Sequence, residues 1–315
     1  MLDALKEIVK QPYWIIALIA GAILVAFPFI TIDKEFYLQS HPPSALLPVI
    51  IGIFLLAVSL ASFAFTLWST HKKELLTAGG LDLSLVKESK GILSVTVGTC
   101  ILRVAEGRIE DFPIRSEGTV VVLPCNEYFD DECARDKKSS LGAYVGKVFE
   151  NQVDEFVSLV KTKAKENLGP GEEQQKSKNE RAESFGAGRC LLLLKPLGRS
   201  VPIALVSTTI QRSDRGLNGR LSFLFDGIHD LCRCLAEKRL DRVVMPVLAG
   251  GHSGIHPPLA FVGLLLAITE ALRYRPGGRG IEQLTVVVFR ADDDSKPAVD
   301  NFIVRRALAL VASRD

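Results

Sequence analysis

Two uncharged apolar stretches near the beginning of the chain constrain its fold more than any other feature. The first runs over residues 11–32 and the second over residues 45–68. A helix needs about 20 apolar residues to cross the hydrocarbon core of a bilayer. Neither stretch has the polar face that a surface helix of a soluble protein normally carries. The pattern therefore predicts a two-helix transmembrane hairpin over residues 1–72, in preference to two buried core helices.

Lysines flank this hairpin and indicate its orientation. Lys6 and Lys10 precede the first stretch, Lys72 and Lys73 follow the second, and the link between the stretches holds only Lys34. An excess of lysine and arginine marks the cytoplasmic side of a membrane protein. We therefore expect a multi-pass protein of the cell inner membrane with both termini in the cytoplasm. Neither stretch contains an ionisable residue, so we expect an anchor, or a pore only where several copies assemble.

Composition excludes some functions for the rest of the chain. A net charge of +2 over 315 residues gives no sign of nucleic-acid binding. The six cysteines form no Cys-x-x-Cys pair and the five histidines are scattered, so we predict reduced thiols and no metal site. Cys232 and Cys234 are two residues apart, on different sides of a predicted helix.

After a linker at residues 73–90, strand and helix patterns alternate. This alternation predicts an α/β fold, a three-layer sandwich around a mostly parallel sheet. The polar, charge-rich segment 165–184 is predicted to be a flexible insertion. The predicted strands cover residues 91–98, 100–105, 119–123, 190–194, 203–209, 242–248 and 284–289, and the predicted helices cover residues 141–160, 221–235, 259–272 and 298–311. The run 259–268 is too short to span a bilayer, so we expect a buried core helix there.

Two loops and one helix start form the candidate ligand site. The loop 124–129 follows one predicted strand, and the loop 249–254, with three glycines, follows another. Ligands of open α/β sheets bind outside the carboxyl ends of the strands. Successive N–H groups of glycine-rich loops can hold phosphate, and so can the helix start at 139–143. Together these segments predict a phosphate-containing ligand.

The element order, the run 123–129, the Ser-Leu-Gly helix start and the loop at 246–254 resemble the macro domain. The resemblance covers roughly residues 91–314, within a macro domain predicted over residues 91–315, and implies binding of ADP-ribose-type nucleotides, with no cofactor. Behind a two-helix hairpin, such a domain is similar to the membrane effector of type II Thoeris antiphage systems. The resemblance implies that a partner TIR enzyme makes a signal nucleotide from NAD. The nucleotide would then drive homo-oligomers that disrupt membrane lipid.

The same resemblance implies the residues that bind the ligand. Asn126 would bond a ribose, glycines would surround the pyrophosphate, and Arg290 would lie at the adenine end, with Phe289 in the core. The implied ligand-binding residues are Asn126, Ser140, Leu141, Gly142, Gly250, Gly251, His252, Ser253, Gly254 and Arg290. For Arg212, Arg215 and Arg220 two roles remain open: they bind the phosphates of the ligand, or they belong to a solvated loop.

Two departures from the macro-domain pattern favour binding over catalysis. Arg108 stands where the family has an acidic residue in a Gly-Asp-Ile segment, and Asn126 lacks the paired asparagine of ADP-ribosyl hydrolases. We therefore expect no catalytic residues and no enzyme activity. A membrane-anchored ADP-ribosyl hydrolase is the alternative, and a scaffold with a degenerate pocket is a third possibility.

Overall fold

A computed structural model describes most of the chain after residue 80. The described residues are 81–112, 118–177, 179–212, 216–251, 253–273, 280–292 and 295–312. Residues 81–315 form one compact unit. The predicted transmembrane hairpin lies outside the described residues. Among those described, no helix combines the length and the apolar character needed to cross a membrane.

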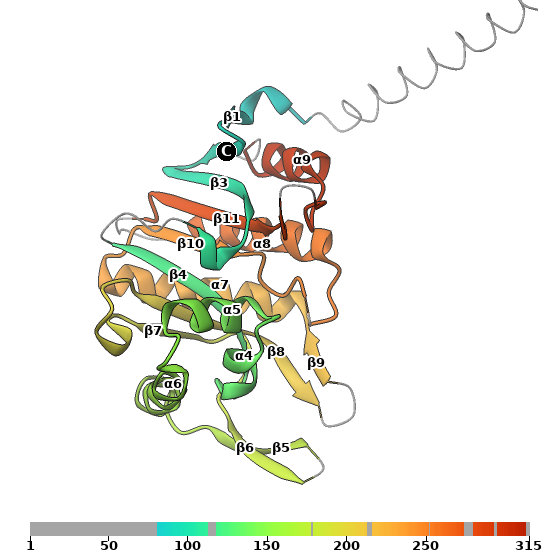
Figure 1. Cartoon of the computed structure of the whole chain (residues 1–315). Helices are drawn as coiled ribbons and strands as arrows, with labels where there is room; N and C mark the ends of the chain where they lie inside the picture. Colours follow the sequence, from blue (N-terminus) through green and yellow to red (C-terminus); the bar gives the residue numbers. More distant parts are fainter. Residues whose placement is uncertain are drawn as a thin grey trace, which may run out of the picture. The chain divides into compact units, whose positions relative to one another are not determined.

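A mixed sheet of nine strands runs through this unit (Figure 1). Its strands lie in the order β1-β2-β3-β11-β10-β4-β8-β7, and β9 pairs with β8. The central strands, from β3 to β8, are parallel, whereas β1, β2, β7 and β9 pair antiparallel. Their bounds are β1 (Lys87–Ser89), β2 (Ile92–Val97), β3 (Cys100–Gly107), β4 (Thr119–Asn126), β7 (Cys190–Leu193), β8 (Ile203–Arg212), β9 (Gly216–Gly219), β10 (Arg242–Pro246) and β11 (Gln283–Phe289).

Helices cover both faces of the sheet and enclose two apolar cores. In β4, Val120 and Val122 pack into the core beneath α7, α8 and α9, whereas Val121 and Leu123 pack into the core beneath α4, α5 and α6. Successive side chains of a strand point to opposite faces, so a strand buried on both faces is apolar throughout. The predicted three-layer α/β arrangement is therefore confirmed. The helices are α4 (Asp131–Arg135), α5 (Ser140–Val148), α6 (Val153–Leu168), α7 (Leu221–Lys238), α8 (Pro257–Arg273) and α9 (Asn301–Ala312).

The structure divides the single helix that was predicted over residues 141–160. α5 ends at Val148, and α6 begins at Val153. The ring of Phe149 turns into the core and lies 4.9 Å from the ring of Phe156, measured between centroids. The polar residues 150–152 follow it at the surface. Residues of α5 and α6 pack into the same core, so apolar residues continue at helical spacing across the break. Periodicity alone therefore could not locate the break.

The segment 165–184, expected to be a flexible loop, differs most from its prediction. α6 continues to Leu168, and β5 (Glu172–Ser177) and β6 (Glu180–Ser184) form a separate antiparallel hairpin. The buried ammonium group of Lys176 lies 2.7 Å from Asp130 and 2.8 Å from Glu132. Burial alone would lower the pKa of Lys176, but hydrogen bonds with these carboxylates raise it. Ion pairs between Lys176 of β5 and two carboxylates distant in the sequence therefore hold this hairpin against the domain.

Other boundaries shift by a few residues. β4 extends through Asn126, so residues 124–126 belong to a strand and not to the predicted loop. The described residues include the short 3-10 helices η1 (Leu83–Leu85), η2 (Ile109–Asp111) and η3 (Pro196–Gly198). Because η1 and β1 belong to the compact unit, residues 81–90 are part of the domain and not of the linker. In α8, Phe261, Leu264 and Leu265 are fully buried, which confirms the expected core helix.

Candidate ligand groove

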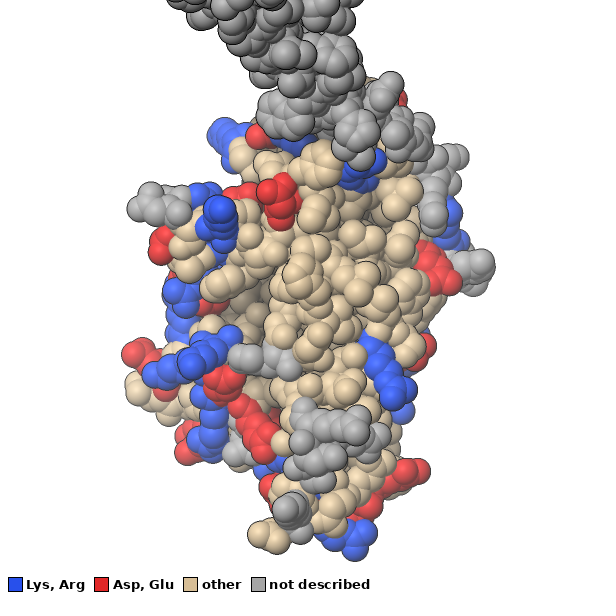
Figure 2. Space-filling model, turned by 90° about the vertical axis from the view of Figure 1, so that its right-hand side faces the viewer, with Lys and Arg blue, Asp and Glu red and all other residues tan. Residues whose placement is uncertain are grey.

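Two adjoining hollows lie at the carboxyl ends of the parallel strands. The larger, the main hollow, has a volume of about 250 Å³, and the side hollow has about 230 Å³. Together we call the two hollows the groove. Six residues line both of them: Lys138, Ser139, Ser140, Pro246, Val287 and Phe289. The side of the molecule that carries these strand ends is largely uncharged at its centre, with basic and acidic residues towards its margins (Figure 2).

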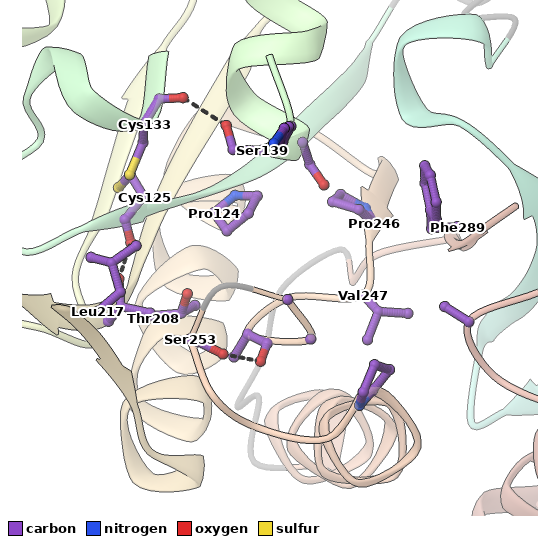
Figure 3. A pocket seen from close by; sticks show the side chains of 18 of the residues that line it. Pro124, Cys125, Cys133, Ser139, Thr208, Leu217, Pro246, Val247, Ser253 and Phe289 are labelled. Atoms are coloured by element: carbon purple, nitrogen blue, oxygen red, sulfur yellow. Dashed lines mark hydrogen bonds between the residues drawn. The ribbon is translucent and has the colours of Figure 1, made fainter. Parts of the chain in front are cut away.

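The central strands supply the walls of the main hollow. β4 contributes Pro124 and Cys125, and β8 contributes Thr208 (Figure 3). Burial raises the pKa of Cys133, which lies beside Cys125, to about 12, and raises that of Cys125 well above its usual value. Both side chains are therefore neutral thiols at neutral pH and contribute apolar surface to the wall.

The start of α5 provides hydrogen-bond donors to the groove. The hydroxyl oxygen of Ser139 accepts the N–H of Gly142 at 2.8 Å, which caps the helix. Within the part of the chain that the structure describes, the N–H groups of Ser140 and Leu141 have no acceptor. Lys138 also lines the groove at this point. Free N–H groups at a helix start favour an anion, and the lysine charge adds to this preference.

Thr208 provides a second polar group. Its side chain is buried in the wall of the main hollow, and its hydroxyl has no hydrogen-bond partner among the described residues. Leaving a buried hydroxyl unsatisfied costs about 1–3 kcal/mol, so such groups usually meet a ligand or an ordered water. Thr208 lies within β8, and a threonine inside a buried strand resembles any other strand residue, so the sequence alone does not mark it as a ligand residue.

The loop after β10 forms another wall. Gly250, Gly251 and Ser253 line the main hollow. A Cβ atom added to Gly251 would meet nothing within 4 Å, so the backbone is open to the groove there. The hydroxyl of Ser253 donates to the carbonyl of Ala249. The backbone carbonyl of Ser253 accepts the N–H of Gly219 at 2.8 Å. Ser253 therefore fixes the loop internally. His252 lies outside the described residues.

Several predicted ligand residues do not line the groove. Asn126 is fully buried; its side-chain oxygen accepts the N–H of Tyr128 at 3.1 Å, and its amide group donates to Asp130 at 3.1 Å. The guanidinium of Arg290 donates to Glu106 and to the carbonyl of Ser295, each at 3.0 Å. Both side chains thus have partners within the protein.

Three further predicted residues serve the local backbone or the core. Leu141 packs into the core beneath α5 and is not a lining residue of either hollow. Gly142 is required by packing, because an added Cβ would lie 2.1 Å from the carbonyl oxygen of Asp136. Gly254 has a φ of +80°, and its N–H bonds to the carbonyl of Gly251. Each glycine therefore has a structural reason that does not involve a ligand.

Phe289 was expected in the core, and this expectation is wrong. Its side chain is 57% exposed and lines both hollows. It is the last residue of β11, where the sheet ends and the side chain meets the groove instead of a helix. Arg108 lines the side hollow and lies 2.6 Å from Glu110. An exposed aromatic ring and a nearby charge pair thus form one end of the groove.

The three arginines of the loop before α7 were considered as possible phosphate ligands. Arg220 precedes α7, lies over the ring of Phe223 at 5.7 Å and does not line either hollow. Arg215 and the side chain of Arg212 lie outside the described residues.

The fold is an α/β domain with a groove at the carboxyl ends of its parallel strands. No protein-family model and no curated protein matches the chain. The solved structures similar to it include the Oceanobacillus iheyensis macrodomain with MES bound, at 13% identity over 71% of this chain and 98% of that chain, with a TM-score of 0.49. The same macrodomain with ADP has 12% identity, 70% and 94% coverage and a TM-score of 0.47. The macrodomain of Thermus aquaticus DarG has 18% identity, 59% and 97% coverage and a TM-score of 0.38.

Proposed function

We propose that the described unit is a macro-type domain that binds an ADP-ribose-type nucleotide in the groove. One observation carries the proposal: anion-binding donors and an exposed aromatic ring lie along the same groove. The N–H groups of Ser140 and Leu141 and the ammonium of Lys138 suit a pyrophosphate. The ring of Phe289 suits stacking with an adenine base.

The size of the groove supports a ligand that occupies both hollows. Pockets for small ligands generally have volumes of about 300–1,000 Å³. Neither hollow alone reaches that range, but the two adjoin and share six lining residues. ADP-ribose is an elongated molecule. It would place its base by Phe289, its phosphates by the start of α5 and its distal ribose beside Thr208 and Gly251.

We propose a sensor and not a hydrolase. Hydrolysis needs a group that activates water, most often a carboxylate or a histidine. Among the described residues that line the main hollow, Lys138 is the only charged one and none is a carboxylate. Asn126 has its hydrogen-bond partners inside the protein. Incubating the full-length protein with an ADP-ribosylated protein tests this: no release of ADP-ribose is expected, and efficient turnover would contradict the sensor.

We further propose that the sensor acts at a membrane as an effector in antiphage defence. The uncharged stretches 11–32 and 45–68 support an inner-membrane hairpin with both termini in the cytoplasm. A partner TIR enzyme would supply the signal nucleotide, and two helices per chain would disrupt lipid only as a homo-oligomer. Ligand must then bind the assembled state more tightly than the resting one, because equal affinities shift no equilibrium.

The membrane proposal is tested with detergent-solubilised full-length protein and with liposomes that enclose a dye. ADP-ribose, its cyclic forms and its base-conjugated forms are added separately. We expect one class to increase the particle mass in light scattering and to release the dye. Deletion of residues 1–71 should preserve binding and abolish release. Dye release by the truncated protein would contradict action through the hairpin.

A further inference from the structure

A third hollow lies away from the groove, at the β7 edge of the sheet. This edge hollow has a volume of about 480 Å³ and is lined by residues of α6, of α7 and of β7 with the segment after it. It has no lining residue in common with the groove. Two cysteines, Cys190 and Cys234, are among its lining residues.

The structure brings these cysteines together from different elements. Cys190 is the first residue of β7, and its N–H donates to the carboxylate of Asp230 at 2.8 Å. Asp230 lies one turn before Cys234 on α7, so the two share a helix face. Both cysteines line the edge hollow, and each shifts the pKa of the other. Cys190 is buried, whereas Cys234 is only partly so.

The surroundings of the pair are basic. Lys163, Lys195, Arg233 and Lys238 line the edge hollow together with one carboxylate, that of Glu237. Arg233 pairs with Asp230 at 2.6 Å and with Glu237 at 2.8 Å. In the described part of the chain, neither Lys195 nor Lys238 forms an ion pair. The hollow thus keeps an excess of positive charge, which attracts small anions.

The two thiols differ in acidity. The hydrogen bond with Cys190 lowers the pKa of Cys234, and the same bond, together with burial, raises the pKa of Cys190. Cys234 therefore has the more populated thiolate and is the more accessible of the two. Attack on a disulfide requires the thiolate and access to it, so Cys234 is the nucleophile and Cys190 the second thiol.

We propose that Cys234 and Cys190 form a thiol–disulfide exchange site for small anionic disulfides. The Cys234 thiolate attacks one sulfur of the disulfide, forms a mixed disulfide and expels one thiolate. Cys190 then loses its proton to solvent and attacks the Cys234 sulfur, which expels the second thiolate. The protein dithiol is oxidised to a disulfide by two electrons, and the small disulfide is reduced to two thiols.

Oxidised glutathione, which carries carboxylates, is the probe for the full-length protein. Samples are quenched with an alkylating agent at successive times, and mass spectrometry of the peptides identifies each cysteine. We expect a Cys190–Cys234 disulfide to form at least about 10-fold faster than any adduct of Cys133, because burial keeps Cys133 a neutral thiol. Equal rates at Cys234 and Cys133 would overturn the proposal.

Two kinds of variant sharpen the test. Cys190→Ser should stop the reaction at a glutathione adduct on Cys234, whereas the control Cys232→Ser should leave the disulfide unchanged. Lys195→Glu should slow the reaction with oxidised glutathione several-fold but not that with neutral 2-hydroxyethyl disulfide, and Lys87→Glu, on β1, should affect neither. If Cys190→Ser does not fold, rapid quenching of the unmodified protein must show the Cys234 adduct before the disulfide. Absence of that adduct would overturn the proposed order.

Discussion

The segments that follow β4 and β10 occupy neighbouring positions but use their polar groups differently. At the end of β4, Asn126 and Glu127 are buried, and the Glu127 carboxylate accepts the N–H of Gln211 at 2.9 Å through each of its oxygens. After β10, Gly250 and Gly251 line the main hollow. A polar residue at a strand end therefore stabilises the fold where partners lie within reach. The glycine backbone after β10 lines the hollow in which we propose that the ligand binds.

The largest expected effect tests a glycine that serves the fold. Gly142→Ala would place a Cβ atom 2.1 Å from the carbonyl oxygen of Asp136, and backbone cannot yield as a flexible side chain can. We expect the free energy of unfolding to fall by about 3–5 kcal/mol, measured by denaturant unfolding. The matched control is Gly146→Ala in the same helix, where an added Cβ meets nothing within 4 Å. It should be neutral or stabilise by about 0.5–1 kcal/mol. Equal stability of the two variants would contradict the packing role.

The next effect tests a glycine that we assign to the ligand. Gly251→Glu places a carboxylate where the proposed phosphates lie, in a loop with open space around the Cβ position. We expect nucleotide affinity to fall about 100-fold, or about 3 kcal/mol, with an unchanged unfolding midpoint. Gly251→Ala is the control and should retain most of the affinity. Unchanged affinity in Gly251→Glu would remove this loop from the site.

Asn126→Ala tests the other side of the comparison. The variant leaves the buried N–H of Tyr128 without its acceptor, so we expect stability to fall by about 2 kcal/mol. Affinity, measured below the unfolding transition, should change little. Asn126→Asp keeps an acceptor but brings a second carboxylate to Asp130, and it should also destabilise. A loss of affinity without a loss of stability would show that Asn126 contacts the ligand, contrary to this account.

The smallest effect concerns the aromatic end of the groove. Because Phe289 is 57% exposed, Phe289→Ala should leave stability nearly unchanged. We expect it to weaken binding of adenine nucleotides by about 1 kcal/mol through lost stacking. Phe302→Ala, on α9, is the control, since Phe302 is 44% exposed and lines neither hollow. Similar affinities of the two variants would exclude stacking on Phe289.

The sequence predicted the layers of the fold because β4, β10 and β11 are apolar runs that only a doubly covered sheet can bury. It missed the β5–β6 hairpin because the pairing of Lys176 with Asp130 and Glu132 joins segments far apart in the chain. The rule that ligands of open α/β sheets bind at the carboxyl ends of the strands predicted the position of the groove. It did not distinguish side chains that face the groove from those that face inward. That distinction depends on partners such as Gln211 and Glu106, which only the folded chain brings close.

Isothermal titration of ADP-ribose into the full-length protein tests the central claim most directly, with Gly251→Glu and Asn126→Ala measured beside it. We predict one ligand per chain for the unmodified protein and for Asn126→Ala, and binding about 100-fold weaker for Gly251→Glu. Failure of ADP-ribose and of its cyclic and base-conjugated forms to bind the folded, unmodified protein would contradict the account. So would equal binding to Gly251→Glu.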